Sequence, residues 1–184
     1  MLDCNLQPDT LAWLFAQAQS CPPDWLVVDA VSAAKCHKVL AHLAQVQVLK
    51  LNRLEAKALT GLAIDSLADA QRAAHWCWQR GVRHTVLSLG EQGVCWVDAT
   101  GQAGHLAAPN LQIANTNGAG DALLAGVIYG QLAGFLWPQS VQWGMSCAAL
   151  TLAGPTANTP YLTAQAVTAA ILQQERNENQ PHDT

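Results

Sequence analysis

The stretch that decides the fold is IANTNGAGDALLAGVIYG, residues Ile113–Gly130. Its first part, Asn115–Asn117, consists of residues that favour turns and helix N-caps, and an apolar helix is predicted over Ala122–Tyr129. Gly118 and Gly120 lie between the two and have no Cβ, so a ligand can come close to the backbone N–H groups there. Because these N–H groups are unpaired at the positive end of a helix dipole, the junction is typical of an anion site.

Asp121 lies in the first turn of this helix, and its carboxylate allows two interpretations. In the first, it only complements the helix dipole, as many first-turn acids do. In the second, it is a general base that takes the proton from a hydroxyl group attacking a phosphorus atom held by the neighbouring N–H groups. Position alone favours the first interpretation, so the choice depends on the rest of the chain.

The composition indicates one globular domain with its own core. The chain has 184 residues, of which 51% are hydrophobic and 12% are charged. The net charge of −4, with no basic cluster interleaved with aromatic residues, argues against a nucleic acid polymer as partner. No apolar run is long enough to span a membrane, and the N-terminus lacks a signal-peptide pattern. The six cysteines are scattered without a Cys-x-x-Cys pair, which predicts reduced thiols in a cytoplasmic protein rather than disulfides or a zinc site.

Strand-like and helix-like segments alternate along the chain. Strands are predicted at 25–30, 46–51, 82–90 and 93–99, and helices at 9–19, 32–45, 52–61, 66–81, 122–129, 138–154 and 162–175. This alternation predicts an α/β fold with a mostly parallel, Rossmann-like sheet flanked by helices. Ligands of such folds bind beyond the carboxyl ends of the strands, which directs attention to the loops after Asp29, Leu51, Leu89 and Ile113.

Asn52 and Glu55 follow the strand that ends at Leu51. Their spacing of three places an amide and a carboxylate on one face of a helix, where they can order a hydrated Mg²⁺ near phosphates. The same spacing is that of a capping box, with Asn52 as N-cap and Glu55 at the third helical position. The two interpretations are compatible with each other.

A turn from Ser88 to Gly93, with glycines at 90 and 93, connects two predicted strands. It is either a plain β-turn or a backbone loop that wraps around a nucleotide. Two other nucleotide-binding motifs are excluded. The chain has no Gly-x-x-x-x-Gly-Lys-Ser/Thr sequence, and the third glycine of a dinucleotide fingerprint is replaced by Leu123. An oxidoreductase on a similar sheet is therefore disfavoured.

Three motifs of the chain resemble, in this order, those of the ribokinase-like (PfkB) carbohydrate kinases. They are Asn-x-x-Glu, the small hydroxyl residue with the two glycines of the turn, and Gly-Ala-Gly-Asp. The last motif, followed by DALLAG, is the most specific. The resemblance extends from about Trp25 to about Pro160 and implies transfer of the γ-phosphoryl group of ATP to a hydroxyl of a sugar or nucleoside.

The resemblance also implies a role for each motif residue. Asp121 matches the catalytic base, and the N–H groups of Gly118, Ala119 and Gly120 match the anion hole. Asn52 and Glu55 match the motif that orders Mg²⁺ through water and phosphate. The ATP-binding residues implied by the resemblance are Asn52, Ser88, Gly90, Gly93 and Gly120.

Within the family, the segments VDAVSAAK, LKLNRLEAKALTG and CAALTLAGPTANTP look most like pseudouridine kinases. Asn115 fits this subgroup. Many relatives have aspartate at the position of Asn115, where it helps to hold a monovalent cation, so K⁺ is the less supported cofactor beside ATP and Mg²⁺. Ribose, fructose or another sugar remains an alternative to pseudouridine as the acceptor.

Family members are longer, and the resemblance implies that their additional part supplies further strands, a small lid and a Gly-Gly motif that binds the sugar. This chain contains no Gly-Gly pair. Residues 1–175 are therefore expected to form the C-terminal nucleotide-binding part of a ribokinase-like domain, with the sheet incomplete on its N-terminal side, no lid, and a polar tail over 176–184. The partners that this leaves open are a small-molecule substrate, a second copy and a complementing N-terminal fragment.

Two classes of function follow. The first is a kinase, slow or inactive as an isolated chain because positioning of both reactants supplies most of the catalysis in phosphoryl transfer. The second is a non-catalytic remnant that binds nucleotide or depends on a partner subunit.

Overall fold

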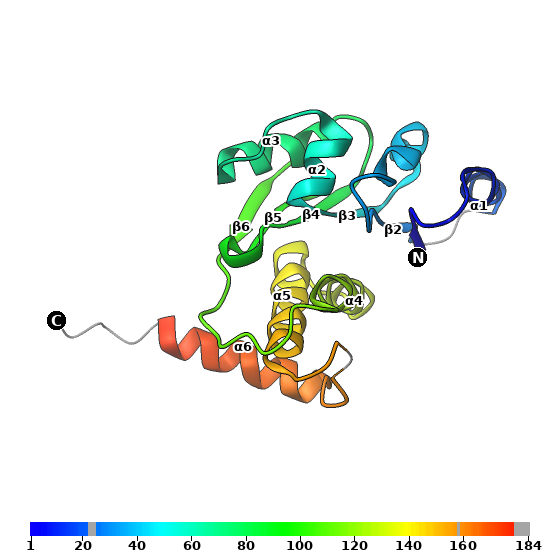
Figure 1. Ribbon diagram of the computed structural model, residues 1–184. Helices are drawn as coiled ribbons and strands as arrows, with labels where there is room; N and C mark the ends of the chain where they lie inside the picture. The colour runs from blue at the N-terminus through cyan, green and yellow to red at the C-terminus, as the bar shows by residue number, and fades with distance from the viewer. Residues whose placement is uncertain (22–24, 158, 179–184) are drawn as a thin grey trace. The chain divides into compact units, whose positions relative to one another are not determined.

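The computed structural model describes residues 1–21, 25–157 and 159–178 (Figure 1). The chain divides into two compact units, Met1–His105 and Leu106–Thr184. Residues 176–178, the start of the expected polar tail, extend the last helix, and the rest of that tail lies outside the described residues.

The first unit is built on a six-stranded sheet whose strands follow one another in chain order. The strands are β1 (Leu2–Asp3), β2 (Val27–Asp29), β3 (Val48–Asn52), β4 (His84–Ser88), β5 (Val94–Val97) and β6 (Ala103–Leu106). The pairs from β1 to β4 are parallel, and β5 is antiparallel to β4. The residues of β2 are all buried, and so are those of β3 and β4 except the last in each, which fits their mainly apolar sequence and requires partners for the buried Asp29 and Lys50.

One layer of helices accompanies this sheet. Its members are α1 (Pro8–Ser20), the 3₁₀ helix η1 (Cys36–Gln45), α2 (Arg53–Thr60) and α3 (Leu67–Trp78). α1 packs against η1, η1 against α2 and α2 against α3, and Figure 1 shows η1, α2 and α3 on the same side of the strands. A core of apolar residues from both layers, including Phe15, Leu49 and Leu87, lies between helices and sheet.

The segment 32–45 was predicted to be helical, and the structure forms a 3₁₀ helix from Cys36 to Gln45. The first two of its buried residues, Cys36 and Val39, are three apart, as in a 3₁₀ helix, and the next buried residue, Leu43, follows after four. Cys36 and Val39 are fully buried, and His42 stacks on Phe15 with ring centroids 4.2 Å apart. Strands β1 and β6 were not predicted.

The second unit contains three helices, α4 (Ala119–Leu132), α5 (Trp137–Ala153) and α6 (Ala164–Glu178). α4 and α5 approach closely because glycines face each other. A Cβ on Gly126 would lie 2.6 Å from the Cα of Gly144. Ala122, Cys147 and Val167 form a small core among the three helices. No strand ends at Ile113, in contrast to the expectation, because the described backbone there is irregular.

Candidate functional site

Asn52 and Glu55 form the predicted capping box at the junction of β3 and α2. The Asn52 Oδ1 accepts a hydrogen bond from the Glu55 backbone N–H at 2.9 Å. In return, the Asn52 backbone N–H and side-chain Nδ2 each donate to one Glu55 carboxylate oxygen at 2.7 Å. The carboxylate is thereby held in one orientation at the carboxyl end of β3.

Glu55 is a buried acid, only 2% exposed. Burial raises the pKa of its carboxyl group, while the hydrogen bond from the Asn52 backbone and the charge of Lys50 act in the opposite direction. Lys50 itself is buried and paired with Asp29, with Nζ at 3.0 and 3.1 Å from the two carboxylate oxygens. A charged network thus lies next to the capping box, at the ends of β2 and β3.

Ser88 and the following turn lie beside Asn52. In the parallel pair β3–β4 the two residues are partners in register, and Ser88 Oγ donates to the Leu51 carbonyl at 3.4 Å. The turn contains the short 3₁₀ helix η2 (Gly90–Gln92) and has Gly90 and Gly93 at φ values of 63° and 88°. These positive φ values explain the two glycines.

Arg53 ties the turn to the capping box. Its guanidinium donates to the Ile64 carbonyl at 3.1 Å and to Gln92 Oε1 at 2.6 Å. The first unit therefore brings together four of the residues singled out from the sequence, Asn52, Glu55, Ser88 and Gly90, with Gly93 closing the same turn.

The start of α4 has the features of an anion site. Gly118 is the N-cap, in the left-handed conformation at φ 80°, and no side chain caps the helix. The first intrahelical bond is donated by Ala122 to the Gly118 carbonyl at 2.9 Å. The N–H groups of Ala119, Gly120 and Asp121 precede that bond, so they are the donors that a helix start leaves for a ligand. The N-cap is therefore Gly118, and not one of the residues Asn115–Asn117 that the sequence favoured for this position.

Asp121 is exposed at the third position of α4. Within the part of the chain that the structure describes, its carboxylate has no hydrogen bond or ion pair. Asn115 instead shapes the preceding loop, since its Oδ1 accepts from the Asn117 N–H at 3.0 Å. The backbone N–H groups of Ala114 and Asn115 donate to the Leu152 carbonyl at the end of α5. The second unit therefore gathers Asn115 and the Gly118–Asp121 motif at one helix start.

A family model described as pfkB family carbohydrate kinase matches residues 2–164. The chain belongs to this family. Pseudouridine kinase from Escherichia coli (strain K12) is 37% identical over 161 residues, which are 88% of this chain and 50% of that protein. The chain spans about half the length of the curated relatives it matches.

Solved structures of PfkB-type kinases share the fold. Phosphofructokinase-2 from Escherichia coli in complex with substrates and products superposes with a TM-score of 0.80 at 20% identity, over 95% of this chain and 56% of that chain. The same protein was also solved in complex with potassium. Arabidopsis thaliana ribokinase complexed with ribose and ATP gives a TM-score of 0.80 at 17% identity, over 92% and 55% of the two chains. The ribokinase-like α/β fold predicted from the sequence is confirmed.

The Asp29–Lys50 pair beside this PfkB capping box was missed by sequence reasoning. One signal was available, because a lysine inside the otherwise apolar strand VLKL requires a buried partner. Its identity was not evident, since Asp29 becomes the cross-strand neighbour of Lys50 only through the β2–β3 register.

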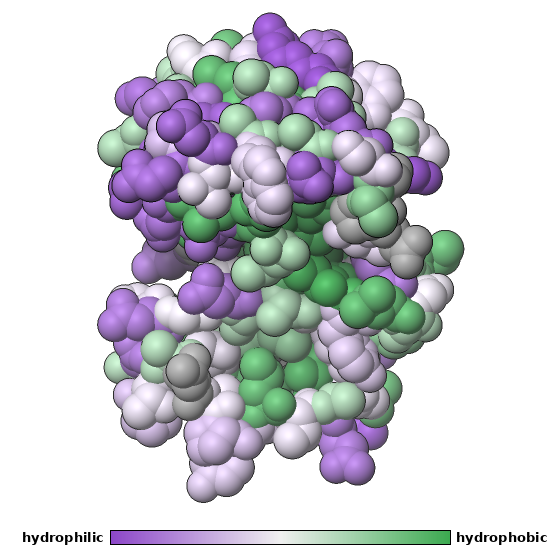
Figure 2. All heavy atoms as spheres, turned by 90° about the vertical axis from the view of Figure 1, so that its right-hand side faces the viewer, coloured by the Kyte–Doolittle hydropathy of each residue, from purple (hydrophilic) through white to green (hydrophobic). Residues whose placement is uncertain are grey.

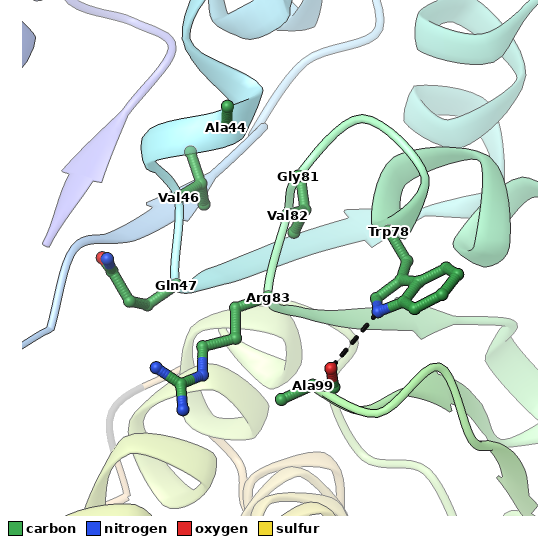
Figure 3. Close-up of a pocket in the computed structure, with 8 residues that line it drawn as sticks. All are labelled: Ala44, Val46, Gln47, Trp78, Gly81, Val82, Arg83 and Ala99. Atoms are coloured by element: carbon green, nitrogen blue, oxygen red, sulfur yellow. Dashed lines mark hydrogen bonds between the residues drawn. The ribbon is translucent and has the colours of Figure 1, made fainter.

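A hollow of about 420 Å³ lies elsewhere in the first unit, near the amino ends of β3 and β4, and so at the opposite edge of the sheet from Asn52 and Ser88 (Figure 3). Trp78 and Arg83 line it, and the Trp78 Nε1 donates to the Ala99 carbonyl at 3.4 Å. None of the predicted site residues lines this hollow.

All six cysteines are free, and all but Cys21 are buried. Burial raises the pKa of Cys77 and Cys95 to about 12, so these thiols are protonated and inert. Among the residues described, no three His, Cys, Asp or Glu side chains gather as a metal cluster, and no helix is both long and apolar enough to cross a bilayer.

Proposed function

We propose that this PfkB protein takes part in the transfer of the γ-phosphoryl group of ATP to a hydroxyl group of a small sugar or nucleoside. The observation that carries the proposal is the start of α4. Among the described residues, the N–H groups of Ala119, Gly120 and Asp121 precede the first intrahelical bond, and the Asp121 carboxylate beside them has no partner. The Glu55 and Asp69 carboxylates accept backbone N–H groups in the capping boxes of the first unit, whereas the Asp121 carboxylate is not engaged in such a box.

In the proposed reaction the acceptor oxygen forms a bond to the γ-phosphorus while the bond from that phosphorus to the ADP oxygen breaks. Asp121 takes the proton of the acceptor hydroxyl. The N–H groups of Ala119, Gly120 and Asp121 donate to the transferring phosphoryl group and balance its negative charge. The turn with Ser88, Gly90 and Gly93 supplies the loop against which the nucleotide rests.

Asn52 and Glu55 fit a hydrated Mg²⁺ better than a directly bound ion. Each Glu55 oxygen already accepts a hydrogen bond from Asn52 and the residue is only 2% exposed, so a direct bond to Mg²⁺ is disfavoured, and a hydrated ion would need one of its water molecules to reach this carboxylate. Mg²⁺ bound in this way would neutralise phosphate charge. A monovalent cation has less support, because the Asn115 amide is neutral and its oxygen already accepts the Asn117 N–H.

Pseudouridine is the acceptor that we propose first, on the strength of the 37% identical Escherichia coli relative named for it. Ribose and fructose are the alternatives. They differ from pseudouridine in lacking a base, so a panel of the three acceptors separates a nucleoside kinase from a sugar kinase.

The test is transfer of label from [γ-³²P]ATP by the full chain to pseudouridine, ribose or fructose. Asp121→Asn is expected to lower product formation by at least about 10²-fold and to leave Mg·ATP affinity unchanged, because only the base is lost. Asp9→Asn is the matched control, since Asp9 is an exposed first-turn acid of α1. Equal activity of the Asp121 variant and the control would sink the base assignment.

A second candidate function is nucleotide binding without transfer by the chain alone. The observation that favours it is the length, since the chain spans only about half of its curated relatives. Binding of Mg·ATP with no labelled product from any acceptor in the panel would establish this alternative.

A further inference from the structure

The hollow near the amino ends of β3 and β4 has no part in the proposed reaction. It lies at the opposite edge of the sheet from Asn52 and Ser88, and neither of them lines it. Its volume of about 420 Å³ is that of a small-molecule site, since such sites measure roughly 300–1,000 Å³. A ligand in the hollow would leave the carboxyl edge of the sheet free for a nucleotide.

Close packing holds the walls of the hollow in place. Gly81, at φ 94°, brings the turn after α3 against the end of η1, and a Cβ on it would lie 2.8 Å from the Cα of Ala44. The Trp78 ring is confined as well. A Cβ on Gly101 would lie 2.8 Å from its Cζ2, and its Nε1 donates to the Ala99 carbonyl at 3.4 Å. Because the walls are formed without a ligand, little order is lost when one binds.

Most of the lining is apolar. The indole of Trp78 already uses its only donor, so it offers a ligand its apolar ring. The other apolar residues of the lining are Ala44, Val46, Gly81, Val82 and Ala99. This part of the hollow suits a flat apolar group.

The two polar side chains of the lining, Arg83 and Gln47, both offer hydrogen-bond donors. Within the described residues the Arg83 guanidinium has no hydrogen bond or ion pair. Gln47 Oε1 accepts the Leu26 N–H at 2.6 Å, which leaves the Nε2 of the same amide for a ligand. Two backbone acceptors at this edge are already used, because the Val46 carbonyl accepts the Arg83 N–H at 3.0 Å and the Gln47 carbonyl accepts the His84 N–H at 2.9 Å.

Apolar side chains are also exposed on the second unit, where Figure 2 shows them in green. Leu132 and Leu136 are 74% and 71% exposed. No charged residue occurs from Ala122 to Ala153, so these two helices offer no group that would select the charge of a ligand. The hollow differs because a guanidinium accompanies its aromatic wall.

We propose that the hollow binds a small aromatic anion, with its ring against Trp78 and its phosphate or carboxylate group at Arg83. Arg83 is the only charged residue of the lining, and a guanidinium pairs with either anion through two parallel N–H donors. In Figure 3 its side chain extends towards Gln47 and away from the Trp78 indole, so the ring and the charged group have separate places. This binding does not depend on phosphoryl transfer.

The experiment titrates the full chain, labelled with ¹⁵N, with phenyl phosphate and follows the indole N–H signals by NMR. The chain has seven tryptophans, and the signal lost in Trp78→Phe is that of Trp78. Phenyl phosphate is expected to shift this signal saturably. Inorganic phosphate and phenol, which each lack one half of the probe, should bind at least tenfold more weakly. Phenylacetate carries a carboxylate instead, and the tighter of the two aromatic anions assigns the charged group.

Arg83→Gln should weaken phenyl phosphate binding at least tenfold, because it removes the charge from the hollow. Arg80→Gln is the matched control and should leave binding unchanged. Arg80 is exposed, lies 3.6 Å from the centroid of the Trp76 ring and does not line the hollow. Ala99→Leu keeps the backbone carbonyl and Arg83, and it should also weaken binding because its side chain fills the hollow. Circular dichroism checks that all three variants keep their helices.

Two outcomes would overturn the proposal. One is a Trp78 signal that does not move up to millimolar phenyl phosphate. The other is equal binding by Arg83→Gln and Arg80→Gln, which would mean that the probe binds elsewhere on the chain. Neither outcome bears on transfer from [γ-³²P]ATP, so this proposal and the proposed function fail separately.

Discussion

At the scale of single residues, Gly118 matters most to the candidate site. It combines a positive φ with a close approach by neighbouring backbone, since a Cβ there would lie 2.5 Å from the Ala157 carbonyl oxygen. The chain offers a matched position in the same unit. Gly134 has φ 81°, and a Cβ there would meet nothing within 4 Å. Substitution of Gly134 therefore measures backbone strain alone, whereas substitution of Gly118 measures strain together with disturbance of the candidate site.

Gly134→Ala is expected to lower the free energy of unfolding by about 1 kcal/mol, because a left-handed alanine is strained. Gly118→Ala should lower it by roughly 2–3 kcal/mol and weaken Mg·ATP binding as well, since the loop at Ala157 must shift away from the helix start. Urea unfolding and calorimetric titration measure the two effects. Equal stability losses with unchanged Mg·ATP affinity would show that the close approach at Gly118 has no functional role.

At the scale of elements, two capping boxes of the same design begin α2 and α3. Asn52 pairs with Glu55, and Ser66 pairs with Asp69. The box of α2 lies at the carboxyl end of a parallel strand, beside the Ser88–Gly93 turn, whereas the box of α3 is exposed at the surface. The comparison therefore separates the capping role of Asn52 from its proposed metal and phosphate role.

Ser66→Ala is expected to cost about 1 kcal/mol of stability and to leave Mg·ATP affinity unchanged. Asn52→Ala should cost more, roughly 2 kcal/mol, because it also removes the partner of a buried Glu55 oxygen. It should also weaken Mg·ATP binding at least tenfold. Thermal unfolding and titration of both variants measure this, and a loss of affinity shared equally by the two would mean that capping alone explains Asn52.

Elements with a local chemical signature could be predicted from the sequence, and those that depend on distant partners could not. The Asn52–Glu55 capping box was predicted because its signal lies within four consecutive residues. Strand β1 is two residues long and exists only through pairing with β2. The Asp29–Lys50 pair likewise depends on register. The sequence singled out the Gly118–Asp121 motif. It did not show that Gly118 is the N-cap of α4, because that assignment depends on the backbone angles.

At the scale of the whole molecule, the predicted site residues fall into two sets. One unit carries Asn52, Glu55 and the Ser88–Gly93 turn, and the other carries the Gly118–Asp121 motif. Because the chain belongs to the PfkB family, we propose that both sets serve the same reaction, phosphoryl transfer from ATP.

Nucleotide binding by this chain is tested by calorimetric titration of the full chain with Mg·ATP, repeated with Mg²⁺ removed by chelator. Saturable binding that weakens without Mg²⁺ and in Gly118→Ala is predicted, because in the proposed site the phosphates would contact the α4 start and Mg²⁺ would neutralise their charge. No heat of binding up to millimolar Mg·ATP would contradict the account, since a chain that holds no nucleotide cannot supply the phosphate site of a kinase.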